Sequence, residues 1–150
     1  MQRIDHVNIV VHDLPGMTAF YRDALGLEVV REVTIQGDWI EAITRLSGVV
    51  ADVVYLQPPE GPPLELIAYR APQGASPDDL GRPNTRGLRH LAFLVQDLDA
   101  TAAAVAAAGG ELLSPVQTVP TTQVEFGTQQ KWIAYCLDPE GNLLELCDYR

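Results

Sequence analysis

The stretch YLQPPEGPPLELIAY at residues 55–69 returns as YCLDPEGNLLELCDY at residues 135–149. The two stretches align without a gap at a shift of 80 residues, and eight of their fifteen positions are identical. Each carries a Pro-Glu-Gly turn signal between two short runs rich in apolar residues, which is typical of two strands joined by a turn. The repeat therefore predicts two similar structural modules in one chain.

A second repeat opens each module. His6 is followed seven residues later by Asp13-Leu14, and His90 is followed at the same spacing by Asp97-Leu98. The two histidines are 84 residues apart instead of 80, so the first module contains a few additional residues. Together the two repeats predict the same order of elements in both modules.

The chain has 150 residues, a length that suits a single domain. We expect residues 1–150 to form one domain, with module one at residues 4–70 and module two at residues 88–150. Residues 71–87 are rich in Pro, Gly and polar side chains and have neither helical nor strand periodicity. This segment is predicted to be a linker.

Each module is predicted to begin with a strand followed by a helix. Residues 4–11 alternate between two faces, as expected for a strand with different surroundings on its two sides. Asp13 is a good N-cap for the helix that follows, and Gly26 can adopt the left-handed conformation that ends a helix. In module two, Asp97 or Asp99 is expected to cap a helix over residues 100–108.

Three short strands are expected after the helix of each module, so each module is predicted to be βαβββ. The fold class is therefore α+β, and the two sheets can lie side by side as one curved mixed sheet around a central cavity, with helices on the convex side. The strands are expected at residues 28–34, 49–57 and 64–69 in module one, and at residues 111–113, 131–137 and 143–149 in module two.

The composition excludes several kinds of partner. Ten Lys and Arg stand against twenty Asp and Glu, which gives a formal net charge of −10 and a pI near 4.5. This is the wrong sign for binding nucleic acid or an anionic membrane surface. No apolar run approaches the roughly 18 to 20 residues of a membrane span, and no signal peptide is apparent. Cys136 and Cys147 are too few for a disulfide framework, so we expect reduced, buried thiols in a cytoplasmic protein.

Two glutamates and two histidines occupy equivalent positions in the repeat. Glu65 and Glu145 each stand between two leucines of a predicted strand, where an unpaired carboxylate would be costly. His6 and His90 are expected on the opening strands, on the face opposite the helix. Singly, such a His is more often a hydrogen-bonded core residue, and such a Glu can point outwards from an edge strand. Their coincidence in both modules favours one divalent cation, and nitrogen and oxygen ligands suit Mn, Fe, Co, Ni or Zn.

The pattern of motifs resembles the vicinal oxygen chelate superfamily over nearly the whole chain. The resemblance rests on the paired modules, on His6 and His90 in the opening strands, on Phe20-Tyr21 before Leu25-Gly26-Leu27, and on the closing segment at residues 138–146. The superfamily includes glyoxalase I, methylmalonyl-CoA epimerase, extradiol dioxygenases, fosfomycin-resistance enzymes and bleomycin-resistance binding proteins. The resemblance implies the glyoxalase-like fold, and a homodimer is common among its members.

The resemblance also implies a ligand set and a reaction. In metal-dependent members the ligands come from the first and last strands of each module, at positions filled here by His6, Glu65, His90 and Glu145. Chelation of two neighbouring substrate oxygens would stabilise the enediolate formed when a carbon next to a carbonyl loses a proton. By similarity to glyoxalase I, Glu145 is the first candidate for the base and Glu65 the second. Such proton transfer leads to isomerisation or epimerisation, and elimination leads to a lyase.

Two other functions stay open from the sequence. A ring-cleaving dioxygenase of the extradiol type would hold Fe(II) with two His and one carboxylate, and a second carboxylate such as Glu65 would crowd that site. A bleomycin-resistance-like protein would sequester an antibiotic or another small molecule, but members of that branch usually lack the metal ligands. The filled ligand positions therefore favour the lyase or isomerase.

Four further residues are expected to bind a small-molecule substrate. Asn8 lies two residues after His6 and should share its face of the strand. Tyr69 and Tyr149 each follow a candidate glutamate by four residues, so strand alternation places them on the same face as that glutamate. Trp39 belongs to a segment that corresponds to loops over the substrate in similar family members, which makes it a candidate lid residue.

Overall fold

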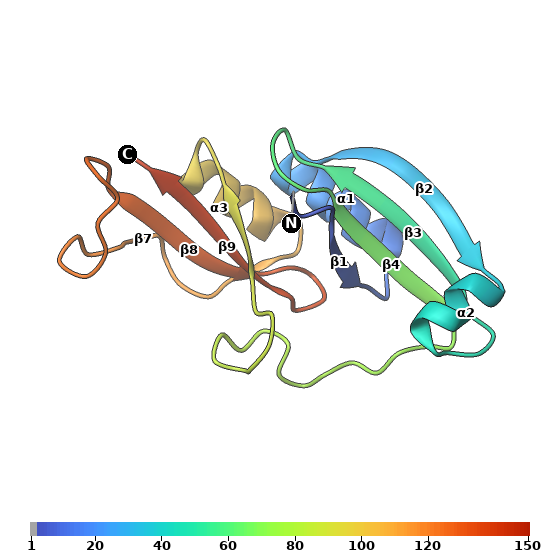
Figure 1. The fold of residues 1–150 in the computed structure, drawn as a ribbon. Helices are drawn as coiled ribbons and strands as arrows, with labels where there is room; N and C mark the ends of the chain where they lie inside the picture. The colour runs from blue at the N-terminus through green and yellow to red at the C-terminus, as the bar shows by residue number, and fades with distance from the viewer. Residues whose placement is uncertain (1–2) are drawn as a thin grey trace. The chain divides into compact units, whose positions relative to one another are not determined.

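The computed structural model describes residues 3–150, and the chain forms two compact units, one up to Ser76 and the other from Pro77 (Figure 1). The boundary lies within the segment that the sequence predicts to be a linker. Each unit contains one mixed sheet, so the expected α+β fold of two βαβββ-like modules is confirmed.

Module one has a four-stranded sheet with the order β1-β4-β3-β2. The first strand pairs in parallel with the last, and the other neighbours are antiparallel. The elements in chain order are β1 (Val7–Val10), α1 (Leu14–Leu25), β2 (Glu28–Gln36), α2 (Asp38–Thr44), β3 (Val50–Gln57) and β4 (Leu64–Ala71).

Module two repeats this topology with the order β5-β9-β8-β6, and an additional short strand, β7, pairs with β8. The parallel pair is again formed by the first and last strands of the module. The elements are β5 (Leu91–Leu94), α3 (Leu98–Ala107), β6 (Glu111–Leu112), β7 (Gln117–Thr118), β8 (Lys131–Leu137) and β9 (Leu143–Tyr149).

The strand register is the same in both modules. Tyr55 lies opposite Glu65 in the β3–β4 hairpin, and Tyr135 lies opposite Glu145 in the β8–β9 hairpin. The sequence repeat is therefore also a repeat of cross-strand neighbours. Since side chains alternate between the faces of a strand, both glutamates lie on the face opposite that of the leucines beside them.

The predicted caps of α1 and one of the two predicted for α3 are confirmed, although α3 begins at Leu98 and ends at Ala107, and the sequence predicted residues 100–108. The Asp13 carboxylate accepts a hydrogen bond of 3.0 Å from the Gly16 amide, and Gly26 ends α1 in the left-handed conformation with φ 71°. Of the two candidate caps in module two, Asp97 caps α3, because its carboxylate accepts a 2.9 Å hydrogen bond from the Ala100 amide. Side-chain oxygens satisfy amide groups that a helix start leaves without partners.

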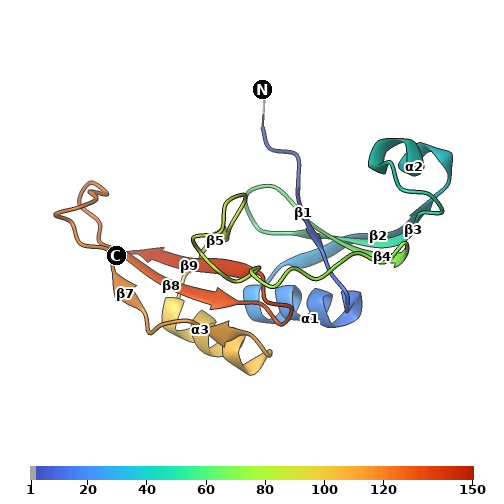
Figure 2. The ribbon, with the colours of Figure 1, turned by 90° about the horizontal axis from the view of Figure 1, so that it is seen from below.

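Each of the longer helices packs on one face of the sheet of its own module (Figure 2). The side chains at these contacts are fully buried and apolar, which leaves the opposite face of each sheet for other groups. They include Met17, Tyr21, Leu56 and Leu66 in module one, and Leu98, Val105, Leu144 and Leu146 in module two.

Three sequence expectations need correction. His6 and His90 immediately precede β1 and β5 and do not lie within them, because the first paired residues of these strands are Val7 and Leu91. The segment around Trp39, expected to be a loop, forms the short helix α2. The strand β7 was not expected, since its two residues are too few for any periodicity.

Both cysteines are free and buried, as expected. Burial raises the pKa of the Cys136 thiol to about 11 and also raises the pKa of Cys147. The thiols are therefore protonated and unreactive at neutral pH. Within residues 3–150, no helix combines the length and the hydropathy needed to cross a membrane.

Candidate functional site

Module one brings His6 and Glu65 together. The His6 Nε2 atom lies 3.6 Å from Glu65 Oε2, although the two residues are 59 positions apart in the chain. The parallel pairing of β1 with β4 produces this approach, because Val7 is paired with Leu64. The side chain of Glu65 is only 14% exposed, so its carboxylate is partly removed from water.

Two neutral donors hold the Glu65 carboxylate in place. The Tyr55 hydroxyl donates to Oε1 at 2.5 Å, and the Asn8 side-chain amide donates to Oε2 at 2.7 Å. The hydrogen bond to Glu65, together with burial, raises the pKa of the Tyr55 phenol to about 12. At neutral pH the phenol therefore stays protonated and keeps donating to the carboxylate.

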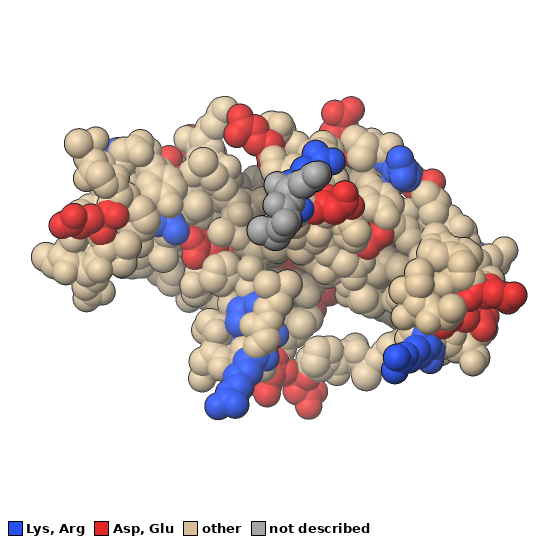
Figure 3. Space-filling model, viewed as in Figure 1, with Lys and Arg blue, Asp and Glu red and all other residues tan. Residues whose placement is uncertain are grey.

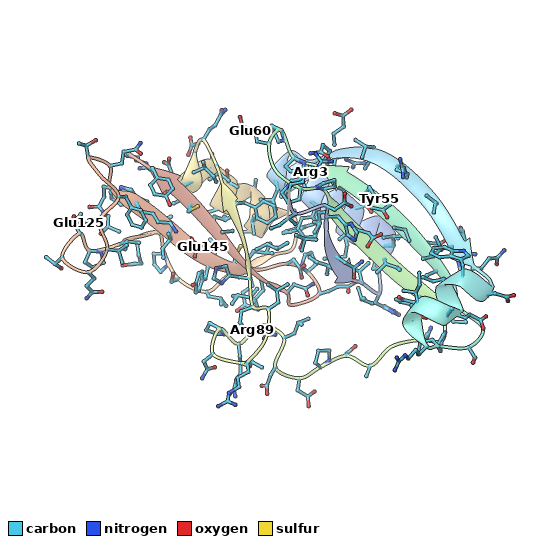
Figure 4. The ribbon with its side chains drawn as sticks, in the orientation of Figure 1. Arg3, Tyr55, Glu60, Arg89, Glu125 and Glu145 are labelled. Carbon is cyan, nitrogen blue, oxygen red and sulfur yellow. The ribbon has the colours of Figure 1, made fainter. Side chains whose placement is uncertain are left out.

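Module two brings His90 and Glu145 together in the same way. The His90 Nε2 atom lies 3.5 Å from Glu145 Oε2, and the Glu145 side chain is 8% exposed. The donor to the other carboxylate oxygen differs from that in module one, since Lys131 Nζ donates to Glu145 Oε1 at 2.7 Å. Figure 4 labels Tyr55, which belongs to the β3–β4 hairpin of module one, and Glu145, which belongs to the β8–β9 hairpin of module two.

The charge of Lys131 is maintained by its carboxylate partner. Burial alone would lower the pKa of the Lys131 ammonium, but the hydrogen bond and the negative charge of Glu145 outweigh this effect, so the pKa is raised. The Lys131 side chain is therefore a charged ammonium at neutral pH. Such a partly buried ion pair is far less screened by water than a surface pair.

The chemistry and spacing of each pair suit a transition-metal ion. Neighbouring ligands of one ion, with bonds of about 2.1 Å, lie roughly 3 Å apart, and the His–Glu separations of 3.6 and 3.5 Å are close to this value. Imidazole nitrogen and carboxylate oxygen are suitable ligands for Mn, Fe, Co, Ni and Zn. Within residues 3–150, no group of three or more His, Cys, Asp or Glu is already gathered for a metal, so each module by itself offers two ligands.

The predicted substrate-binding residues lie in different surroundings. Asn8 is at the Glu65 carboxylate, as described above. Tyr69 packs against the buried cluster of Ala51, Val53 and Ile67 on the Glu65 face of β3 and β4. The Tyr149 ring lies 5.3 Å from that of Phe126 and beneath the Lys131 ammonium. Trp39 is 56% exposed on α2. The four substrate-binding assignments stay predictions.

Two residues at the glutamates were missed by sequence reasoning, Tyr55 and Lys131. Tyr55 is part of the repeat quoted at the outset, and its place opposite Glu65 follows once the hairpin register is known. Lys131 lies opposite Tyr149, so its side chain extends along β8 and β9 to reach Glu145. The sequence feature that could have drawn attention to Lys131 is that it is the only lysine in the chain.

A cavity of about 400 Å³ lies elsewhere in module one, between the start of α1 and the strands β2 and β3. Thr34 and Asp52 contribute to its lining, whereas His6 and Glu65 do not. The Asp52 carboxylate is already engaged there, since it accepts hydrogen bonds from the Thr34 hydroxyl and the Arg70 guanidinium. This cavity is separate from the His–Glu pair of the same module.

The two βαβββ-like modules with mixed sheets have the glyoxalase-like fold. The sequence model of the Glyoxalase/Bleomycin resistance protein/Dioxygenase superfamily matches residues 3–146, and the chain belongs to this superfamily.

On the face shown in Figure 3, the described acidic and basic residues are interspersed and do not form a continuous basic patch.

Individual relatives support the same assignment. The chain is 31% identical over 147 residues to the uncharacterized protein YaeR of Escherichia coli, a match that covers 97% of this chain and 95% of the relative. It resembles the crystal structure of a glyoxalase family protein from Bacillus cereus with a TM-score of 0.84 at 24% identity, over 99% of this chain and 95% of the other. It also resembles a glyoxalase I variant from Zea mays with a TM-score of 0.67 at 21% identity, over 96% of this chain and 46% of that protein. The two structural matches show the shared fold.

Proposed function

We propose that this protein is a divalent-metal-dependent enzyme that transfers a proton next to a carbonyl group in a small oxygenated substrate, as a glyoxalase I-like lyase or as an epimerase or isomerase. The observation that carries the proposal is the repeated His–Glu pair, with nitrogen–oxygen separations of 3.6 Å in module one and 3.5 Å in module two. Membership of the glyoxalase-containing superfamily supports the same reaction class.

In this proposal, His6, Glu65, His90 and Glu145 bind one ion. The two carboxylates balance the charge of a divalent cation, which reduces the cost of burying all three groups. When bound, the ion would act as a Lewis acid that stabilises negative charge on two neighbouring oxygens of the substrate. The remaining chemistry, acceptance and return of a proton, belongs to the protein.

Glu145 is the proposed base. Among the described residues, both oxygens of Glu65 accept hydrogen bonds, from Tyr55 and from Asn8. Glu145 accepts one only at Oε1, from Lys131. The Oε2 atom of Glu145 therefore accepts no hydrogen bond among the described residues, whereas each oxygen of Glu65 already accepts one that would compete with an incoming proton.

A substrate-independent experiment tests the proposed function. Co²⁺ is added to the metal-free protein, and its visible absorption is recorded before and after addition of acetohydroxamate, a small chelator that binds through two neighbouring oxygens. We expect one Co²⁺ per chain and a change of the spectrum as the chelator occupies open coordination positions. Failure to bind Co²⁺, or a spectrum that the chelator leaves unchanged, would contradict the proposal.

Two further measurements on the same protein, O₂ consumption and ligand binding without metal, distinguish the alternative functions. A dioxygenase would consume O₂ when loaded with Fe(II) and given a catechol, while a sequestering protein would bind its ligand equally well after removal of the metal. We expect neither result. The homodimer, the small-molecule partner and the cytoplasmic location stay predictions of the sequence and are part of this proposal.

A further inference from the structure

The two modules differ at one position beside their glutamates. Lys131 lies opposite Tyr149, and at the equivalent place in module one Ala51 lies opposite Tyr69. Ala51 is fully buried in an apolar cluster with Val53. Module two thus carries the only lysine of the chain where the repeat has a buried alanine.

The surroundings of Lys131 are unusual for a lysine. Its side chain is 17% exposed, and its ammonium lies 2.7 Å from Glu145 Oε1. The ammonium also lies 5.8 Å from the ring centroids of both Phe126 and Tyr149, which are favourable positions for a cation. Two aromatic rings and one carboxylate therefore hold an ammonium group that has lost most of its water.

Glu145 is the only acidic partner that Lys131 has within residues 3–150. If the two glutamates balance a divalent ion, as the proposed function requires, the Lys131 ammonium is left as an uncompensated charge in a poorly hydrated place. The bound ion would also repel it. An isolated buried charge is costly, so a bound anion at this position is favoured.

We propose that Lys131 binds a carboxylate group of the substrate, so that the substrate is a small oxygenated carboxylic acid. This inference rests on the proposed function. Substrate binding would draw the ammonium away from Glu145 Oε1 and give it a new carboxylate partner. Glu145 Oε1 would then lose the hydrogen bond that Lys131 donates to it. Lys131 would thus select an acidic substrate.

The test compares chelators that differ only in charge. The Co²⁺-loaded protein is titrated with butyrohydroxamate and with succinomonohydroxamate, in which a carboxylate replaces the terminal methyl group, and also with the acid that is one methylene longer. We expect at least one acid to bind about ten- to a hundredfold more tightly than the neutral compound, as for a hydrogen bond between charged groups. Lys131→Met should remove this preference, and Lys131→Arg should retain part of it.

Arg150→Met is the matched control. Arg150 is also basic and lies one residue beyond Tyr149, but it contacts Asp99 on α3 and Asp148, on the other face of the sheet. Its replacement should leave the preference for the acids unchanged. A parent protein with no preference, or a Lys131→Met variant with the parent's preference, would overturn the inference while the proposed function stands. A parent that binds no Co²⁺ would overturn both.

A second measurement does not depend on the stability of a variant. Because the chain has one lysine, reductive methylation with ¹³C-formaldehyde labels a single side chain in addition to the terminal amine. Methylation keeps the positive charge. In the Zn²⁺-loaded protein, the Lys131 signal should shift when an acidic hydroxamate binds and change little with butyrohydroxamate. An acid that binds without moving this signal would overturn the inference.

Discussion

Replacement of Glu145 by glutamine is expected to slow metal-dependent exchange of a carbon-bound proton by about 10²- to 10⁴-fold, the usual contribution of a general base. Glutamine keeps the size of the side chain and an oxygen for the ion, but it cannot accept a proton at neutral pH. The measurement is the disappearance of the α-proton signals of hydroxyacetone in D₂O by NMR, with Zn²⁺ at saturating concentration. Hydroxyacetone serves as a probe because it offers two neighbouring oxygens and an acidic carbon between them.

Glu65→Gln is the matched control for this experiment. Both variants lose one carboxylate from the proposed ligand set, so a loss common to both reports on the metal. The additional loss in Glu145→Gln reports on the base. Equal rates in the two variants would contradict the assignment of Glu145, and a slower rate in Glu65→Gln would transfer the role to Glu65.

Replacement of Asp138 by alanine is expected to lower the free energy of unfolding by about 3 kcal/mol, because it leaves three partly buried donors without their carboxylate partner. Asp138 is 3% exposed in the turn between β8 and β9. Its Oδ1 atom accepts hydrogen bonds from the amides of Glu140 and Asn142, at 3.0 and 2.8 Å, and its Oδ2 atom accepts one from the Asn142 side chain at 2.8 Å. Urea denaturation of parent and variant measures the difference.

The repeat offers a control for this turn. Pro58 occupies the position equivalent to Asp138 in module one and has no side-chain hydrogen bonds to lose. Pro58→Ala should therefore change the free energy of unfolding by less than about 1 kcal/mol. An equally small change in the free energy of unfolding for Asp138→Ala would show that the Asp138 carboxylate does not stabilise this turn. The turn precedes β9, which carries Glu145.

The parts of the fold that were predicted correctly are those with local chemical signals. Asp13 and Gly26 delimit α1 through capping, and the strands at residues 131–137 and 143–149 were predicted with the bounds that the structure has. The helix α2 has no such signal. Its N-cap is Gly37, which provides no side-chain hydrogen bond, and its seven residues are too few for a clear apolar periodicity.

The candidate site was predicted only in part for a related reason. The internal repeat identified the His–Glu pairs, because equivalent residues recur at fixed offsets along the chain. The hydrogen-bonding partners of the glutamates depend instead on which residues face each other across a hairpin, and a shift of one residue would turn them to the other face. Tyr55 and Lys131 could therefore be assigned only once the register of each hairpin was known.

The central claim, one divalent ion bound by His6, Glu65, His90 and Glu145, is tested most directly by metal content. The protein is purified without a metal-binding tag and analysed by mass spectrometry beside His90→Ala, Glu145→Gln and the control His12→Ala, which removes the exposed third histidine of the chain. We expect about one transition-metal ion per chain in the parent and in His12→Ala, a loss of metal in His90→Ala, and a reduced metal content in Glu145→Gln, whose weaker amide ligand is compensated only at saturating metal concentration. A parent without metal after reconstitution with Mn, Fe, Co, Ni and Zn in turn, or a His90→Ala variant that keeps the metal content of the parent, would contradict the claim.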